Sequence, residues 1–226
     1  AGAYACDGIY SYRNNLNAES MCAFFGGLMY TLSGTTLYTV PSAQSVFTAG
    51  VRVAAEQQEN YIFFGNGQTS PYKYNGAFTR HGVPAPTVTA AVASAAGVGG
   101  LTSGAAYTYA YTYVNTNLVE GNISPITTTF AVSASGGNLQ VSGFSTAPVS
   151  FGVNSIYVYR TKANSTTPYY RVATLTTASS SYTDTVADTA LALQAPTDNG
   201  QPPQYNAICF ALGRVFCNDA NNPNFL

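Results

Sequence analysis

Glycine-marked reversals between short β-prone segments are the feature that most constrains the fold of this chain. In residues 20–40 the reversals fall at Gly26-Gly27 and at Ser33-Gly34. Glycine pairs favour tight hairpin turns because those turns need positive φ angles. The pattern therefore predicts antiparallel strands joined by hairpins, and not helices.

Two later segments, residues 59–86 and 204–226, repeat this pattern of an aromatic or apolar strand, a glycine turn and a further strand. In residues 204–226 the turn is at Gly213, and another strand is expected to begin at Phe225. Repeated meanders of this kind are typical of β-propeller blades, and ordinary β-meanders are the open alternative. Three such units are too few to close a ring.

Residues 87–199 form a different module with seven short β-prone segments. Seven strands in about 110 residues are typical of a fibronectin-type-III or immunoglobulin-like sandwich. The module contains no cysteine, which excludes an antibody-like disulfide. The predicted strands are residues 87–93, 105–116, 127–133, 138–144, 154–161, 169–175 and 181–185.

The predicted fold class is thus all-β, with propeller-like meanders flanking a seven-stranded sandwich. The predicted domains are a meander region (1–86), the sandwich (87–199) and a further meander hairpin (200–226). Proline-rich linkers bound the sandwich, since proline donates no ladder hydrogen bond and holds the preceding residue extended.

The low charge narrows the functional classes. Only 8% of the residues are charged, 13% are aromatic, and the formal net charge is −1. Nucleic-acid binding draws its affinity from clustered Lys and Arg, so eight scattered basic residues predict no nucleic-acid partner. A tyrosine-rich surface with few charges suits a protein that stays in contact with neighbours.

The sequence shows no targeting or membrane segment. No apolar run approaches the roughly 18 residues of a membrane helix, so no membrane span is expected, and no signal peptide is visible. The absence of an initial Met and the end at Leu226 indicate a fragment or a processed product.

No catalytic, cofactor or metal residue is predicted, and the chain is not expected to be an enzyme. The single histidine, His81, lies in a Gly-flanked turn and has no nucleophile motif near it. Glu56 and Glu59 lie in a polar connection, residues 54–60, that we expect to be exposed. Glu120 lies in a turn that it helps to shape.

Asp184, Asp188 and Asp198 gather at the end of the sandwich. Calcium prefers such oxygen ligands, but the spacing fits no calcium-loop signature, so turn and cap roles are favoured.

The four cysteines, Cys6, Cys22, Cys209 and Cys217, form no CxxC pair, so a zinc site is not expected. Buried thiols acting as small apolar side chains are the favoured interpretation. Approach of Cys209 and Cys217 across a hairpin is the alternative.

A tyrosine ladder is the one informative candidate surface. Tyr107, Tyr109, Tyr111 and Tyr113 share one face of a strand because side chains alternate with period two. In one interpretation these rings cover the sandwich core. In the other they form an interaction face for a neighbouring subunit or a sugar ring, since tyrosine joins an apolar ring to a polar tip.

Several stretches resemble structural proteins of tailed bacteriophages, similar to the tail-nozzle and tail-tube components of short-tailed phages. The resemblance covers most of the chain beyond residue 20, and its relatives continue past the point where this chain stops. It rests on YIFFGNGQTSPYKYNG (61–76), HGVPAP (81–86), YTYAYTYVNTNLVEGNISP (107–125), IYVYRT (156–161), YYRVATL (169–175), YTDT (182–185) and QPPQYNAICFALGRVFC (201–217).

The resemblance implies propeller-like blades with an inserted sandwich and a non-catalytic virion protein of the tail or neck. Such a protein is expected to form a homo-oligomeric ring or sleeve, to contact other virion proteins, and to be assembled in the host cytoplasm. The alternative is an extracellular, adhesin-like attachment module that binds a host-surface glycan.

Overall fold

The structure is a computed structural model that describes residues 5–13, 18–33, 36–39, 47–134 and 136–222. Its regular structure is almost entirely β-strand, which confirms the all-β class. The chain divides into two compact units, Ala1–His81 with Pro202–Leu226, and Gly82–Gln201. These divisions lie a few residues from the predicted boundaries at 86/87 and 199/200.

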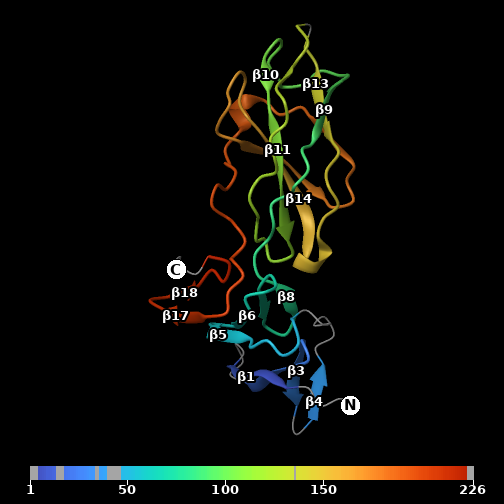
Figure 1. The fold of residues 1–226 in the computed structure, drawn as a ribbon. Coiled ribbons are helices and arrows are strands. Elements are labelled where there is room, and N and C mark those ends of the chain that lie inside the picture. The colour runs from blue at the N-terminus through green and yellow to red at the C-terminus, as the bar shows by residue number, and fades with distance from the viewer. Residues whose placement is uncertain (1–4, 14–17, 34–35, 40–46, 135, 223–226) are drawn as a thin grey trace. The chain divides into compact units, whose positions relative to one another are not determined.

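Unit 1, the first of these, contains two four-stranded antiparallel sheets in which neighbouring strands follow chain order (Figure 1). Consecutive strands of each sheet pair antiparallel, and the predicted reversal at Gly26-Gly27 lies between β2 and β3. This strand order is shared by propeller blades and by ordinary meanders. The strands are β1 (Cys6–Arg13), β2 (Glu19–Phe25), β3 (Leu28–Ser33), β4 (Thr36–Thr39), β5 (Ala54–Gln58), β6 (Tyr61–Gly65), β7 (Tyr72–Tyr74) and β8 (Phe78–Arg80).

An aromatic cluster fills the space between these two sheets. Phe24 of β2 contacts Phe64 of β6 edge-on, with ring centroids 4.9 Å apart. Phe47 and Phe78 join the same cluster, and Tyr72 stacks on Phe78 at 4.4 Å. Edge-to-face and offset pairs add stabilisation to the burial of ring area, so these aromatic strands pack as a common core.

Residues 54–60, expected to be an exposed polar connection, instead form β5 and its turn. The segment Ala54–Gln58 pairs along its whole length with β6, and Glu59, with φ of 49°, turns the chain. Ala, Glu and Gln have low strand preference, so propensity did not reveal the strand. Pairing against the buried aromatic strand β6 overrides that preference.

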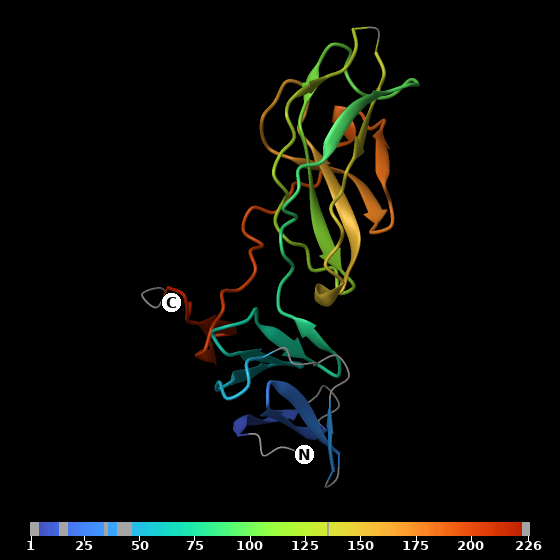
Figure 2. The same ribbon diagram turned by 45° about the vertical axis from the view of Figure 1, so that its right-hand side comes forward.

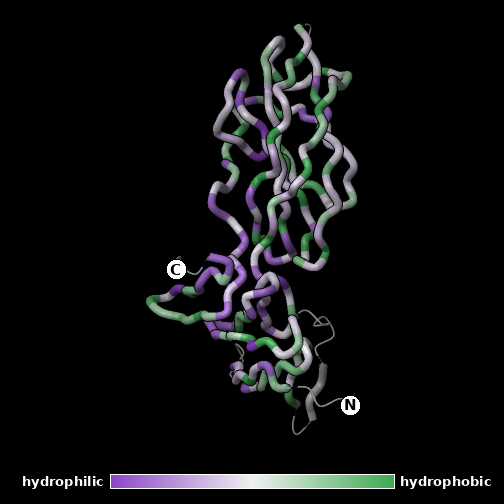
Figure 3. The backbone as a smooth tube through the Cα atoms, in the orientation of Figure 1, coloured by the Kyte–Doolittle hydropathy of each residue, from purple (hydrophilic) through white to green (hydrophobic). Residues whose placement is uncertain are grey.

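A hairpin from the far end of the chain completes unit 1. It consists of β17 (Ile208–Ala211) and β18 (Arg214–Cys217), with the predicted turn at Leu212-Gly213. Tyr205, just before it, is fully buried against Gly65 of β6, and its carbonyl accepts a hydrogen bond from the Gly67 amide at 2.8 Å. Figure 3 shows much of this hairpin as hydrophobic. The strand predicted at Phe225 lies outside the described residues.

Unit 2 contains strands close to all seven predicted segments, arranged mainly in two three-stranded antiparallel sheets (Figures 1 and 2). The sheet orders are β11-β14-β15 and β16-β13-β9, and β10 pairs separately with β12. The elements are β9 (Ala91–Ala95), β10 (Ala106–Tyr107), β11 (Tyr109–Asn115), β12 (Phe130–Ala131), β13 (Asn138–Ser142), η1 (Val149–Phe151), β14 (Val153–Arg160), β15 (Tyr170–Thr176), β16 (Ser181–Asp184) and η2 (Asp188–Ala190).

One hydrophobic cluster joins the two sheets of unit 2, as in a sandwich. Leu139 and Val141 of β13 contribute from one sheet, and Ile156 and Val158 of β14 from the other. Each pair is separated by one residue because alternate side chains of a strand share a face. The structure therefore supports a β-sandwich, while a fibronectin-type-III connection pattern stays a prediction.

The outer edge of β11 is covered by the loop that follows it. The amides of Ser124 and Thr127 donate to the carbonyls of Tyr111 and Tyr109 at 2.8 and 2.9 Å. The hydroxyls of Ser124 and Thr127 accept hydrogen bonds from the amides of these same two tyrosines. This double pairing satisfies a buried strand edge without another strand of the sheet.

Candidate functional site

The four ladder tyrosines lie in the core of unit 2. Tyr107, Tyr109 and Tyr111 are fully buried, and Tyr113 is 3% exposed. This arrangement agrees with the interpretation in which the rings cover the sandwich core. The predicted interaction face at these residues is wrong for this chain, because the opposite sheet covers the rings and leaves no exposed aromatic surface.

The buried phenol groups are each held by a hydrogen bond at the core's margin. Tyr109 donates to the Oδ2 atom of Asp184 at 2.8 Å, and Tyr111 to the carbonyl of Val88 at 3.0 Å. Tyr113 donates to the carbonyl of Ser145 at 3.1 Å. A buried hydroxyl without such a partner would cost free energy, so the ladder also fixes the loops that it reaches.

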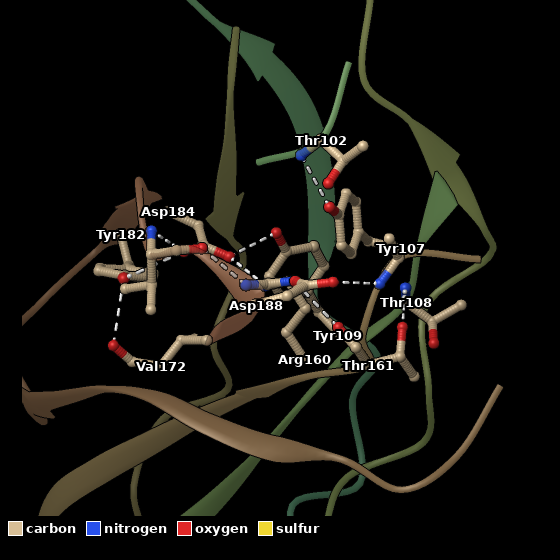
Figure 4. Close-up of polar contacts among 12 residues, drawn as sticks. Thr102, Tyr107, Thr108, Tyr109, Arg160, Thr161, Val172, Tyr182, Asp184 and Asp188 are labelled. Atoms are coloured by element: carbon tan, nitrogen blue, oxygen red, sulfur yellow. Dashed lines mark hydrogen bonds and ion pairs between the residues drawn. The ribbon is translucent and has the colours of Figure 1, made fainter. Parts of the chain in front are cut away.

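Arg160, at the end of β14, is the centre of a buried polar network (Figure 4). Its side chain is fully buried; Nε pairs with Asp184 Oδ2 at 2.7 Å and Nη1 with Asp188 Oδ1 at 2.6 Å. Nη2 donates to the carbonyl of Val186 at 2.8 Å. The guanidinium also lies 4.6 Å from the ring centroid of Tyr107. Arginine suits this position because its planar group donates several hydrogen bonds in fixed directions.

The network raises the pKa values of two tyrosines and of Arg160. Burial, and then the charge of Asp184, raise the pKa of Tyr109 and of Tyr182. Burial alone would lower the pKa of Arg160, but Asp184 and Asp188 raise it overall. Tyr109 and Tyr182 are therefore neutral and Arg160 is charged at neutral pH. The ion pairs of Arg160 tie β14 to β16 and to the segment that follows it.

Two of the three aspartates considered for calcium meet in this network, and Asp198 is not part of it. Asp188 uses its second oxygen to accept the Ala163 amide at 2.7 Å, and Asp184 accepts the Val186 amide at 3.0 Å. Arg160 supplies the positive charge that these carboxylates need. Among the described residues, no group of three or more His, Cys, Asp or Glu side chains gathers as a metal site would require.

Glu120 anchors the outer surface of β11 and β14. Its Oε1 atom accepts hydrogen bonds from Thr112 at 2.6 Å and from Tyr159 at 2.5 Å. Burial, and then the bond to Glu120, raise the pKa of Tyr159. The residue fixes the loop after β11 onto the sheet, in keeping with the shaping role predicted for it.

His81, in its Gly-flanked turn, is partly buried in unit 1. Its ring lies 4.7 Å from that of Phe63, and its amide donates to the carbonyl of Pro71 at 2.8 Å. Burial, and then the charge of Lys73, lower the pKa of His81 to about 4. The imidazole is therefore neutral at physiological pH.

The cysteines do not share one environment. Cys22 is buried, as the favoured interpretation expected, and burial raises the pKa of its thiol to about 12. Cys6 and Cys209 are exposed, and Cys217 is partly buried, which differs from that expectation. All four are free; Cys209 pairs with Phe216 across the hairpin, and Cys217 pairs with Ile208, so the two thiols lie on opposite faces.

Exposed apolar side chains gather on two surfaces of unit 1. Ile9 and Met21 are 54% and 37% exposed and line a shallow groove over β1, β2 and β3 together with Leu32. On the hairpin, Phe210 and Phe216 are also exposed, and the turn residue Leu212 is almost completely so. Phe210 pairs with Val215 and Phe216 with Cys209, so these two exposed rings lie on opposite faces of the hairpin. Only the groove at Ile9 and Met21 is a contiguous apolar surface of the kind that is typical of protein contacts.

Unit 2 has an almost uncharged sequence over a long stretch. Between Arg80 and Arg160, Glu120 is the only Asp, Glu, Lys or Arg residue. Its carboxylate is already engaged by Thr112 and Tyr159, so the rest of this stretch presents an uncharged surface. That surface includes the exposed apolar side chains of Val98, Leu118 and Val149.

The fold defines the class of the protein as all-β, with a sandwich unit and a meander unit. Its surface exposes apolar side chains and carries few charges. No protein-family model matches the sequence, and no curated protein matches it significantly. None of the helices in the described residues is long and apolar enough to span a membrane.

Proposed function

We propose that this chain is a non-catalytic structural protein of a virion, a component of a phage tail or neck that acts by assembly. It would form a homo-oligomeric ring or sleeve and would contact adjoining virion proteins. The observation that carries the proposal is the exposed apolar surface of unit 1, at Ile9 and Met21 and at the β17–β18 hairpin. The resemblance to tail proteins supplies the class of assembly.

The low charge supports the same proposal. A net charge of −1 on 226 residues gives copies little mutual repulsion, so apolar and polar surfaces can approach at modest cost. The buried ion pairs of Arg160 tie β14 to β16 and η2, and a partner that is ordered before binding loses less entropy on binding. We expect interfaces on the order of 1,000 Å² or more between neighbouring chains.

Electron microscopy of the purified full chain tests this proposal. The expected result is rings or sleeves of uniform diameter, which should dissociate when Ile9 and Met21 are both replaced by Lys. The matched control replaces Thr174 and Thr176, two exposed positions of β15, by Lys. Particles that never form in the unaltered chain would contradict the proposal.

A second candidate function, glycan attachment, has one specific observation in its favour. A hollow of about 320 Å³ is lined by Arg171, Thr174, Leu193 and neighbours, close to the lower size limit of ligand pockets. Arg171 also lies 4.5 Å from the ring centroid of Tyr157. Binding of a sugar there should shift the amide signals of β15 in an NMR titration, and a glycan array without signal would count against it.

A further inference from the structure

Strand β9 (Ala91–Ala95) pairs on one side only. Its five residues form an unbroken antiparallel ladder with β13, from Ala91 opposite Ser142 to Ala95 opposite Asn138. Among the described residues, no backbone hydrogen bond reaches its other edge. In Figure 2, β9 is the green arrow that faces the viewer.

The other edges of the two sheets are protected. The loop after β11 covers the edge of that strand, as described above. Along β15, the Arg171 amide donates to the Leu193 carbonyl at 2.8 Å, and the Ala195 amide to the Tyr169 carbonyl at 2.9 Å. The short strand β16 carries Asp184, a charge directed into the core, which is a known way to prevent edge pairing.

Strand β9 has none of these devices. It contains no charge, no proline and no bulge, and Ala91, Ala93 and Ser94 are exposed. The nearest charged residues along the chain are Arg80 and Glu120. An exposed, uncharged strand edge offers free amides and carbonyls to another strand.

We propose that β9 pairs antiparallel with β9 of a second copy, about a two-fold axis at Ala93. Ala91 would then lie opposite Ala95 of the other copy, and Val92 opposite Ser94. The two β16-β13-β9 sheets would become one continuous sheet. This inference rests on the proposed function, since it names one surface through which copies assemble.

A second copy fits this edge for two reasons. The sequence Ala-Val-Ala-Ser-Ala reads almost the same in both directions, so a two-fold axis brings small side chains together on both faces. The strand also has no charge that would be placed beside its own copy, where like charges destabilise a pair. A charged partner would find no complementary group along this strand.

Native mass spectrometry of the full chain tests the pairing with two variants, Ala93→Lys and Ala93→Glu. Each alone should weaken dimerisation about fivefold, because equal charges would face each other at the axis. An equimolar mixture of the two should recover dimers, and these should contain one copy of each. Gln140→Lys, on the central strand β13 and exposed on the same face, is the control and should leave dimerisation unchanged.

Two results would overturn the inference: dimerisation of Ala93→Lys equal to that of Gln140→Lys, or a mixture that forms no mixed dimer. In either case, rings or sleeves that persist in Ala93→Lys would leave the proposed function standing. If the unaltered chain formed no dimers and no larger assemblies, both proposals would be contradicted.

Discussion

At the residue scale, the burial of an ion pair decides what the loss of one partner costs. Arg160 is fully buried and bound by two carboxylates, whereas Arg13 pairs with Glu19 at the surface, where both side chains are more than half exposed. A buried ion pair that loses one partner leaves an uncompensated charge, and a surface pair does not. Removal of the arginine should therefore destabilise the protein far more at Arg160 than at Arg13.

Replacement of Arg160 by Met should lower the free energy of opening of unit 2 by about 3–5 kcal/mol, because Asp184 would stay buried without its cation. Arg160→Lys should recover part of this loss, since it restores the charge without the planar donors. Arg13→Met is the control and should cost less than about 1 kcal/mol. Hydrogen exchange of the β11 and β14 amides measures the effect, and equal protection in Arg160→Met and the unaltered chain would refute it.

His81 gives a pH-dependent test at the same scale. Because its pKa is lowered to about 4 in the folded protein, against 6.5 for an ordinary histidine, the unfolded chain binds the proton first as the pH falls. The resulting contribution to stability is present above pH 6.5 and is lost as the pH falls through about 4. Histidine NMR signals are simple to assign because His81 is the only one.

The expected measurement is an imidazole C2 proton that titrates near pH 4 in the folded chain and near 6.5 in urea. Replacement by Gln should remove this part of the dependence of stability on pH between 4 and 6.5. A folded-state midpoint at the ordinary value would show that the ring is solvated, contrary to its packing against Phe63.

The sequence predicted the shared face of the ladder tyrosines but not the ion pairs of Arg160. Period-two spacing placed the ladder tyrosines on one face, but spacing alone cannot say whether that face meets a core or a solvent. Arg160 was not singled out, since its partners Asp184 and Asp188 follow it by more than twenty residues. The one available signal was the pair of aspartates close together in a charge-poor chain, which could indicate either a cation or an arginine.

At the element scale, turn chemistry predicted most of the strands. Gly26-Gly27 and Gly213 mark observed reversals, with positive φ angles at each. Strand β5 and strand β1 were missed, because Ala, Glu and Gln in one and Asp7-Gly8 in the other have low strand preference. Their pairing with β6 and β2 depends on tertiary contacts that no local pattern contains.

Gly65 gives a test of how the hairpin segment packs on β6. A Cβ atom at this position would lie 2.4 Å from the ring and the carbonyl of Tyr205, closer than such contacts occur. Gly65→Ala should therefore destabilise unit 1 by about 1–3 kcal/mol through overpacking. Gly200→Ala, where the nearest atom is 4.0 Å away, should change stability by less than about 0.5 kcal/mol.

Hydrogen exchange at β6 and β17 measures this effect in unit 1, and Gly200→Ala is a control for an added methyl group in unit 2. Faster exchange at both strands in Gly65→Ala, with little change in Gly200→Ala, is the expected result. Unaltered exchange in Gly65→Ala would mean that Tyr205 does not pack against β6 in solution.

At the scale of the whole molecule, the sequence predicted the all-β class. It could not predict which surfaces remain exposed, because exposure depends on how sheets cover one another. Ile9 and Met21 looked no different in sequence from Cys22 and Phe24, which are buried. Their alternation along β1 and β2 becomes informative only once the covered face of the sheet is known.

The central claim is that this chain works by holding copies and neighbours together through charge-poor β surfaces. Sedimentation velocity of the full chain over a hundredfold range of concentration tests this claim most directly. The account predicts a weight-average mass that rises with concentration to a defined oligomer and depends only weakly on salt, because few charges lie at the contacts. A single species of 23.6 kDa at every concentration would contradict it.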